Sequence, residues 1–184
     1  GKKVNTSFAE SSYNYTVTIS NDDGSTEISV YDRLKRRTAS KKKNISGQWV
    51  EVHYQYDKFD RVWKESEPFT GSASQWNTTE YDLYGRIKKV TSFTGRVTNY
   101  TYSGLNTTIN DGVKSITTTL NGMDKVVSVQ DPGGTINYTY HGNGEMKTTS
   151  YGGLVTSTEI DGWGRKTKLT DPNSGAVSYT HLRA

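Results

Sequence analysis

Three histidines and two closely spaced glutamates are the residues of this chain whose chemistry could serve metal binding or catalysis. His53, His141 and His181 each fall at or beside the end of a predicted strand, and their spacing does not suggest convergence on a metal ion. Glu65 and Glu67 would share one face of a strand that continued through both, a pairing that suits acid–base work at a glycosidic bond. A carbohydrate hydrolase is therefore one hypothesis. We nevertheless predict no catalytic, metal-binding or cofactor-binding residue.

Two further features bear on binding. Seven basic residues lie within residues 33–43 and could contact phosphates, although lysines at strand edges also discourage edge pairing: Arg33, Lys35, Arg36, Arg37, Lys41, Lys42 and Lys43. The pairs Gly133-Gly134 and Gly152-Gly153 lack the Lys-Ser/Thr and the helix that phosphate loops need, so we predict hairpin turns there. A module that binds surface glycans or a partner protein is the second alternative, with nucleic acid less favoured as a partner.

The composition limits the structure that could position such residues. The 184-residue chain has a net charge of +4, 31% hydrophobic residues and no cysteine, which excludes disulfides, thiolate nucleophiles and cysteine-based zinc sites. Thirteen tyrosines, four tryptophans and four phenylalanines favour an ordered protein whose sheets face water on at least one side. We predict no membrane span, and expect any export signal to lie outside this piece.

A short motif recurs along the chain, and it accounts for most of the charged residues near predicted turns. Its copies step by 25, 25, 39, 20 and 20 residues, and the 39-residue step predicts a degraded copy near Tyr102. The copies are YDRLKRR from Tyr31, YDKFDRVWK from Tyr56, YDLYGRIKK from Tyr81, LNGMDKVVS from Leu120, YHGNGEMKT from Tyr140 and IDGWGRKTK from Ile160.

The prolines support this repeat independently. Each of Pro68, Pro132 and Pro172 lies seven residues after the basic residue of a copy, and a glycine follows each within three residues. The phase predicts one turn at the motif and a second turn near the Pro-Gly.

Between these turns the sequence alternates with a period of two, as in Ile136, Tyr138 and Tyr140, which predicts strands. No window has helical spacing. Each repeat is therefore predicted to be a β-hairpin, and the motif residues are predicted to shape its turn: an aspartate accepts backbone N–H groups, a glycine takes positive φ, and an arginine pairs with a carboxylate.

On these residues the chain resembles RHS/YD-repeat proteins. The match rests on Tyr56-Asp57 with Arg61, Tyr81-Asp82 with Gly85-Arg86, and Ile160-Asp161 with Gly164-Arg165, together with the turn prolines. The resemblance implies an all-β fold in which tandem hairpins form a curved, spiralling antiparallel sheet, part of a shell or barrel wall. It also implies a structural role, because such shells enclose a C-terminal toxin polypeptide in bacterial polymorphic toxins and toxin complexes, and teneurins use a similar shell in adhesion.

The resemblance covers about residues 27–181, and residues 182–184 depart from the pattern. We expect residues 1–184 to be a single segment of a longer array, secreted or at the cell surface, with neighbouring repeats and an enclosed polypeptide as its partners. Lys35, Asp60 and Asp124 replace the motif glycine, which raises the expectation that those turns differ in shape. Four tryptophans do not share one phase of the repeat and are predicted to pack along the sheet: Trp49, Trp63, Trp76 and Trp163.

Overall fold

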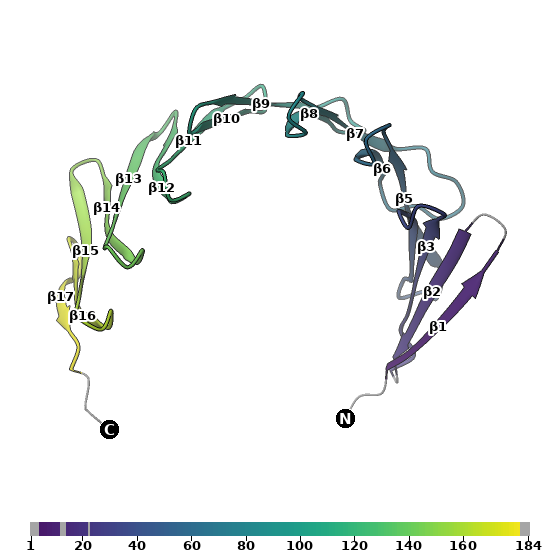
Figure 1. The fold of residues 1–184 in the computed structure, drawn as a ribbon, viewed down its shortest axis with the longest axis horizontal. Coiled ribbons are helices and arrows are strands. Elements are labelled where there is room, and N and C mark those ends of the chain that lie inside the picture. Colours follow the sequence, from purple (N-terminus) through teal and green to yellow (C-terminus); the bar gives the residue numbers. More distant parts are fainter. Residues whose placement is uncertain (1–3, 12–13, 22, 181–184) are drawn as a thin grey trace. The chain divides into compact units, whose positions relative to one another are not determined.

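The computed structural model describes residues 4–11, 14–21 and 23–180, and these residues form strands and turns only. None of the described residues forms a helix that is long and apolar enough to cross a membrane. The contacts divide the chain into two compact units, residues 1–97 and residues 98–184. Figure 1 shows both units as successive antiparallel strands. The all-β prediction is confirmed.

The first unit has eight strands, and each of the first seven pairs with the strand that follows it in the sequence. Thr, Val and Tyr are common in them and suit a pleated surface that is half covered. The strands are β1 (Val4–Glu10), β2 (Asn14–Asn21), β3 (Thr26–Asp32), β4 (Arg37–Lys43), β5 (Trp49–Tyr56), β6 (Val62–Ser66), β7 (Trp76–Tyr81) and β8 (Ile87–Thr91).

The second unit repeats this arrangement with nine strands, each again antiparallel to the next. Its first strand begins at Val97, which is the last residue of the first unit. The strands are β9 (Val97–Ser103), β10 (Asn106–Asn110), β11 (Ser115–Leu120), β12 (Val126–Asp131), β13 (Gly134–Tyr140), β14 (Met146–Tyr151), β15 (Leu154–Ile160), β16 (Lys166–Asp171) and β17 (Gly175–Ser178).

In the part of the chain that the structure describes, neither unit has a second layer packed on its sheet. Among the described residues only Ala39 and Ser66 are buried, with 6% and 2% of their surface exposed. Most side chains on the less exposed face, such as Tyr138 and Tyr140, are half-buried by their neighbours in the same sheet. A hairpin alone is marginal in water, so the stability of such a sheet must come from contacts between successive hairpins.

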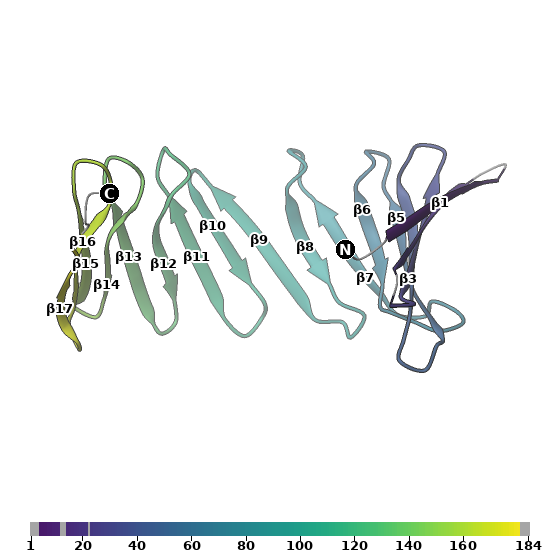
Figure 2. The same cartoon turned by 90° about the horizontal axis from the view of Figure 1, so that it is seen from below.

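The turns alternate between the two edges of each unit's sheet, as Figure 2 shows. Because consecutive strands are antiparallel, every motif copy places its turn at the same edge of its unit. The pairing register shifts by one residue just before the motif position of Tyr31, Tyr56, Tyr81, Leu120, Tyr140 and Ile160. All six copies therefore combine a short turn with a β-bulge.

Two connections depart from the repeat. At the degraded copy, strands β9 and β10 are joined through Gly104 and Leu105 alone, and Gly104 has a φ of 56°. The connection of residues 67–75 between β6 and β7 is longer and returns to β5, where Phe69 and Glu51 exchange two backbone hydrogen bonds of 2.9 and 3.0 Å. This segment thereby occupies the place beside β5 that the short β6 leaves open.

Candidate functional site

The motif turn is built around one carboxylate. Oδ1 of Asp82 accepts the backbone N–H groups of Tyr84 and Arg86 at 2.9 Å each, and Oδ2 accepts Nε–H of Arg86 at 2.7 Å. Backbone bonds from Asp82 N–H to the Arg86 carbonyl and from Gly85 N–H to the Asp82 carbonyl close the turn. Asp57 with Arg61 and Asp161 with Arg165 repeat this arrangement with distances of 2.7–3.0 Å.

The fourth residue of the turn adopts left-handed backbone conformation in all six copies; the residue after it is basic in five copies and is Glu145 in the sixth. Gly85 and Gly164 have φ values of 80° and 82°, and the replacements Lys35, Asp60 and Asp124 have values of 63°, 61° and 57°. The expectation that these replacements change the shape of the turn was therefore wrong. In five copies the carboxylate or amide at the start of the turn holds the same loop conformation, at the cost of a strained backbone where a side chain is present. In the remaining copy the turn starts with His141, and the Asn143 side chain accepts the backbone N–H of Glu145.

Successive motif copies are joined through the arginine of one copy and the tyrosine of the next. The guanidinium carbon of Arg61 lies 4.3 Å from the centroid of the Tyr81 ring, and the Tyr81 hydroxyl donates a 2.6 Å hydrogen bond to the carbonyl of Val62. Arg36 lies 5.0 Å from the Tyr56 centroid, and the Tyr56 hydroxyl donates to the carbonyl of the adjacent residue at 2.7 Å. We call this series of contacts the Tyr-Asp-Arg ladder.

The ladder continues in modified form in the second unit. Lys125 lies 5.8 Å from the Tyr140 centroid, and the Tyr140 hydroxyl donates to the Val126 carbonyl at 2.6 Å. In the next copy the acid is replaced by His141, whose Nε2 lies 2.8 Å from the Thr158 carbonyl oxygen and must donate its proton there. A side chain therefore still links this turn to the following hairpin although Ile160 replaces the tyrosine.

A second contact between copies involves the residue in left-handed conformation. Nη1 of Arg36 lies 2.6 Å from Oδ1 of Asp60 in the next motif turn. A Cβ added to Gly85 would lie 3.7 Å from Nη1 of Arg61, so the same geometry recurs one copy later without the acid. Individual exposed pairs contribute little, and the ladder depends on repetition of the contact.

The turn contacts shift the ionisation of the ladder residues. Burial acts to raise the pKa of Asp57, but hydrogen bonds from the Arg61 side chain and from the backbone of Arg61 and Phe59 hold the pKa below its usual value. The pKa values of Asp32, Asp82 and Asp161 are lowered in the same way, against the same opposing effect of burial. Burial raises the pKa of the Tyr81 hydroxyl, and nearby Arg61 reduces this rise.

Each of the three prolines lies at the edge of its own unit that is opposite to the motif turns. Pro132 and Gly133 form a two-residue connection between β12 and β13, in which Asp131 accepts the Gly133 N–H at 2.8 Å. Pro172 lies in the turn before β17, where Oδ1 of Asp171 accepts the N–H groups of residues 173 and 174. Pro68 falls in the longer connection of residues 67–75. Gly152 and Gly153 form the hairpin turn predicted for them.

The residues considered for catalysis are engaged elsewhere. Strand β6 ends at Ser66, before Glu67, and Oε1 of Glu67 accepts a hydrogen bond from the Asn77 amide at 2.7 Å. His53 lies 3.0 Å from Oε2 of Glu51 and edge-on to the Phe69 ring. No group of three or more acidic or histidine residues in the described part of the chain is placed to hold a metal ion, and His181 lies outside that part.

The basic residues of the 33–43 segment are largely paired within the sheet. Lys41 lies 2.9 Å from Glu51, Lys42 lies 3.2 Å from Glu27, and Arg36 contacts both Asp32 and Asp60. Arg37 and Lys43 lie over the rings of Tyr54 and Trp49. This pairing leaves less free positive charge than the sequence suggests.

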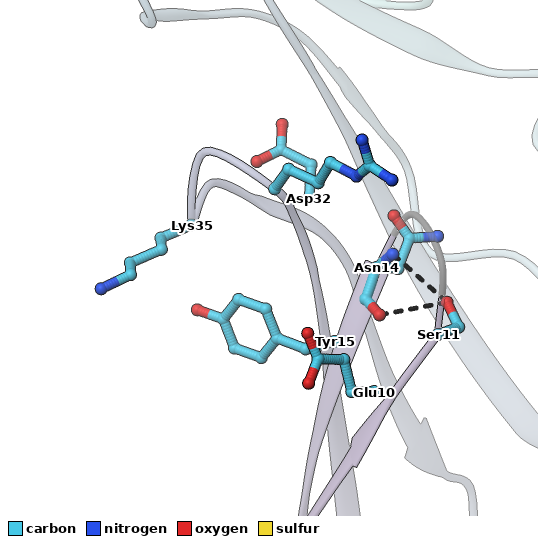
Figure 3. A pocket seen from close by; sticks show the side chains of 7 residues that line it. Glu10, Ser11, Asn14, Tyr15, Asp32 and Lys35 are labelled. Carbon is cyan, nitrogen blue, oxygen red and sulfur yellow. Dashed lines mark hydrogen bonds between the residues drawn. The ribbon is translucent and has the colours of Figure 1, made fainter.

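A concavity of about 760 Å³ opens beside the first motif turn (Figure 3). Glu10, Tyr15 and Lys35 border it, together with Ser11 and Asn14, which hydrogen-bond to each other. The Tyr15 ring stacks on the ring of Tyr31 with centroids 4.8 Å apart, and Asp32 is held by Arg36. The groups around the concavity thus support the end of the sheet, and they form no nucleophile–base pair.

Comparisons with known proteins give a fold and no more. No protein-family model matches the chain, and no curated protein matches it. A crystal structure of TcdB2-TccC3-TEV aligns with 86% of this chain at a TM-score of 0.53 and 11% identity. This chain shares its fold with part of that protein. The aligned part is 12% of the TcdB2-TccC3-TEV chain, so the present chain spans only a small share of it.

A structure of the Photorhabdus luminescens Tc holotoxin pore with mutated TccC3 aligns with 96% of this chain and 16% of its own. Its TM-score is 0.28 at 9% identity, which supports no argument. The similarity to TcdB2-TccC3-TEV is thus the informative one.

One feature of the motif turns was missed in the sequence because only the tryptophans were compared. Phe59 and Tyr84 occupy the same position of their turns as Trp163, two residues after the aspartate, and 63%, 85% and 76% of their surfaces are exposed. Leu34 and Met123 occupy this position in two other copies and are also exposed. Alignment of all large apolar residues on the repeat would have found the series.

Proposed function

We propose that this chain is a wall segment of an RHS/YD-repeat shell, and that the longer protein to which it belongs encloses or presents a C-terminal toxin or effector polypeptide. The observation that carries the proposal is the Tyr-Asp-Arg ladder, which joins successive hairpins in sheets that have no second layer. A wall with one layer needs cohesion along the sheet, and the ladder supplies it.

The mechanism is steric. Within each unit, strands that pair over three to seven residues satisfy the backbone groups of their neighbours and leave no gap through which a protease could reach an enclosed chain. Tyr56, Tyr81 and Asp161 serve the wall through turn and ladder contacts, together with Arg61, Arg86 and Arg165, and none of them acts on a substrate.

The fold shared with TcdB2-TccC3-TEV supports a shell-type structural role over catalysis. By the same resemblance, the whole protein would be secreted or displayed at the cell surface, and its partners would be neighbouring repeats and the enclosed polypeptide. Adhesion through the basic segment of residues 33–43 is a weaker proposal, because most of that charge is paired within the sheet.

The proposal is tested on the longer protein with its downstream polypeptide. Limited proteolysis should cut the downstream polypeptide far more slowly when it is joined to the repeats than when it is expressed alone. Combined Tyr56→Leu and Tyr81→Leu substitutions remove two ladder contacts and should open the wall to protease, whereas Tyr84→Leu, at an exposed turn position, should not. Equal cleavage of the joined and free polypeptides would contradict enclosure.

A further inference from the structure

One motif turn carries an amide where its equivalents carry an acid. In four copies the first residue of the turn is an aspartate that pairs with the arginine four residues later: Asp32 with Arg36, Asp57 with Arg61, Asp82 with Arg86 and Asp161 with Arg165. In the copy that begins at Leu120 these two positions are Asn121 and Lys125. The base of the motif is retained there, whereas the acid is replaced by its amide.

A glycine follows Asn121, and the Asn-Gly sequence is chemically labile. An asparagine loses its side-chain amide as ammonia when the backbone nitrogen of the next residue attacks the Cγ atom, and a glycine, which has no side chain, hinders this attack least. Asn-Gly occurs twice in the chain, at residues 121–122 and 143–144. Both pairs lie in motif turns, so the two sites can be compared within one protein.

The structure distinguishes the two sites by the nitrogen that must attack. The N–H of Gly144 donates a 2.9 Å hydrogen bond to the carbonyl of His141 and closes its turn. In the part of the chain that the structure describes, the N–H of Gly122 donates to no acceptor, and a Cβ added to Gly122 would have no atom within 4 Å. The nitrogen of Gly122 is therefore open to base, whereas attack by Gly144 first requires a hydrogen bond of the turn to break.

The side-chain carbonyl of Asn121 is also better prepared for the attack. Its Oδ1 accepts the N–H groups of Met123 and Lys125 at 2.9 and 3.1 Å. Oδ1 of Asn143 accepts one N–H among the described residues, that of Glu145 at 3.1 Å. Negative charge develops on this oxygen when a nitrogen adds to Cγ, and fixed N–H donors stabilise such charge. The turn that holds a carboxylate in other copies thus favours the addition step at Asn121.

We propose that Asn121 is a site of spontaneous deamidation, which converts the amide copy of the motif into its acid form. The Gly122 nitrogen loses its proton to a base and bonds to Cγ of Asn121, and the Cγ–Nδ2 bond breaks to release ammonia. Water then opens the imide ring. Cleavage between the nitrogen and Cγ leaves aspartate at this position, and cleavage between the nitrogen and the backbone carbonyl carbon leaves isoaspartate.

The two products differ in their effect on the turn. An aspartate accepts the same N–H groups with a charged oxygen, which strengthens these bonds, and offers its second oxygen to the base of the copy as Asp82 does to Arg86. An isoaspartate adds a methylene group to the backbone, inside the ring that the bond from the Asn121 N–H to the Lys125 carbonyl closes. Deamidation therefore either completes the motif or opens the turn. This inference goes beyond the proposed wall function and does not depend on it.

Peptide mapping by mass spectrometry tests the assignment on the unmodified 184-residue chain. The chain is incubated in mildly alkaline buffer made with water that is enriched in a heavy oxygen isotope, both folded and in concentrated urea. In the folded chain, conversion at Asn121 should be several-fold faster than at Asn143, and the product should carry the heavy oxygen. In urea, where neither turn is formed, the two Asn-Gly pairs should react at similar rates.

Two glycine substitutions separate attack by the Gly122 nitrogen from general effects on the turns. Gly122→Ala should slow conversion at Asn121 several-fold and leave Asn143 unchanged, and it should fold normally, because Gly122 lies outside the left-handed region with open space around it. Gly142→Ala is the matched control. Gly142 occupies the same position of the next turn, also with open space, but it follows His141 and no asparagine, so both rates should stay as in the unmodified chain.

The acid product is reproduced by Asn121→Asp, which should raise the urea midpoint of unfolding near neutral pH. Equal rates at Asn121 and Asn143 in the folded chain would overturn the inference, and so would an undiminished rate in Gly122→Ala. Absence of conversion at Asn121 in the folded chain, over a time in which the chain in urea converts, would overturn it as well. A lower midpoint for Asn121→Asp than for the unmodified chain would reject completion of the motif.

Discussion

The guanidinium of Arg61 covers the ring of Tyr81, with 4.3 Å between the guanidinium carbon and the ring centroid. Asp57 fixes the position of Arg61 through hydrogen bonds of 2.7 and 2.8 Å, so one motif turn orders the cation that covers the tyrosine of the next. A cation held over an aromatic ring stabilises the pair more when part of the ring is removed from water. The relationship gives the ladder a direction along the chain.

Removal of the Tyr81 hydroxyl should weaken the first unit while the ring remains covered. We expect Tyr81→Phe to lower the free energy of unfolding by about 0.5–1.5 kcal/mol, because the carbonyl of Val62 loses its hydrogen bond. Urea unfolding followed by circular dichroism measures the loss. Tyr84→Phe is the control, since the Tyr84 ring is exposed at its turn, and an equal loss in both variants would contradict the prediction.

The left-handed position should respond in opposite directions in different copies. Gly85→Ala should destabilise the chain by about 1–2 kcal/mol, and Lys35→Gly should stabilise it by up to about the same amount, because only glycine adopts this conformation without strain. Thermal unfolding of both variants provides the measurement. Gly122→Ala, in a motif turn but outside the left-handed region and with open space around it, should change stability little.

An acid at position 85 should recreate the contact that joins Arg36 to Asp60. We expect Gly85→Asp to be more stable than Gly85→Asn by about 0.2–1 kcal/mol, because Arg61 lies within reach of the new carboxylate and both side chains tolerate left-handed backbone. The difference should shrink in high salt as the pair is screened. A difference that high salt leaves unchanged would show that Arg61 does not pair with the new acid.

Stability should fall at both ends of the pH range. The lowered pKa values of Asp32, Asp57, Asp82 and Asp161 mean that these groups stabilise the fold above their unfolded pKa of about 3.9, and that this contribution is lost as pH falls toward the folded values.

The tyrosines act with the opposite sign. The raised pKa of Tyr81 gives a contribution that is present below the unfolded pKa of about 10 and is lost as pH rises through the folded value. Urea midpoints measured across the pH range should therefore be level near neutrality and drop on both sides. In Tyr81→Phe the alkaline drop should be smaller and the acid drop unchanged, and an alkaline drop of undiminished size would contradict this assignment.

The sequence predicted the hairpins and the motif turns because both depend on local chemistry. Asp82, Gly85 and Arg86 make their decisive contacts within five residues, and strand alternation is visible over similar distances. Contacts between copies were less accessible, because the stacking of Arg61 on Tyr81 depends on pairing register and on the bulge before each tyrosine. The left-handed backbone at Lys35 could not be predicted from the sequence either, because the carboxylate of Asp32 stabilises a conformation that lysine does not favour.

The repeat pattern did not predict that residues 67–75 return to pair with β5. Pro68 marked a turn correctly in phase, but nothing local indicated that Phe69 would pair with Glu51 across the space beside a shortened strand. Likewise, Glu67 resembled half of a catalytic pair until its bond to Asn77 was visible.

Apart from the degraded copy, whose loop is residues 104–105, the motif turns keep a single loop length, whereas the connections at the other edge of each unit range from the two residues 132–133 to the segment 67–75. Inserted or deleted residues can therefore accumulate at one edge without disturbing how hairpins are joined. In such arrays the loops at that edge, and with them the molecules that the edge contacts, can change while the strands stay the same. The same edge is therefore the place to insert a foreign peptide.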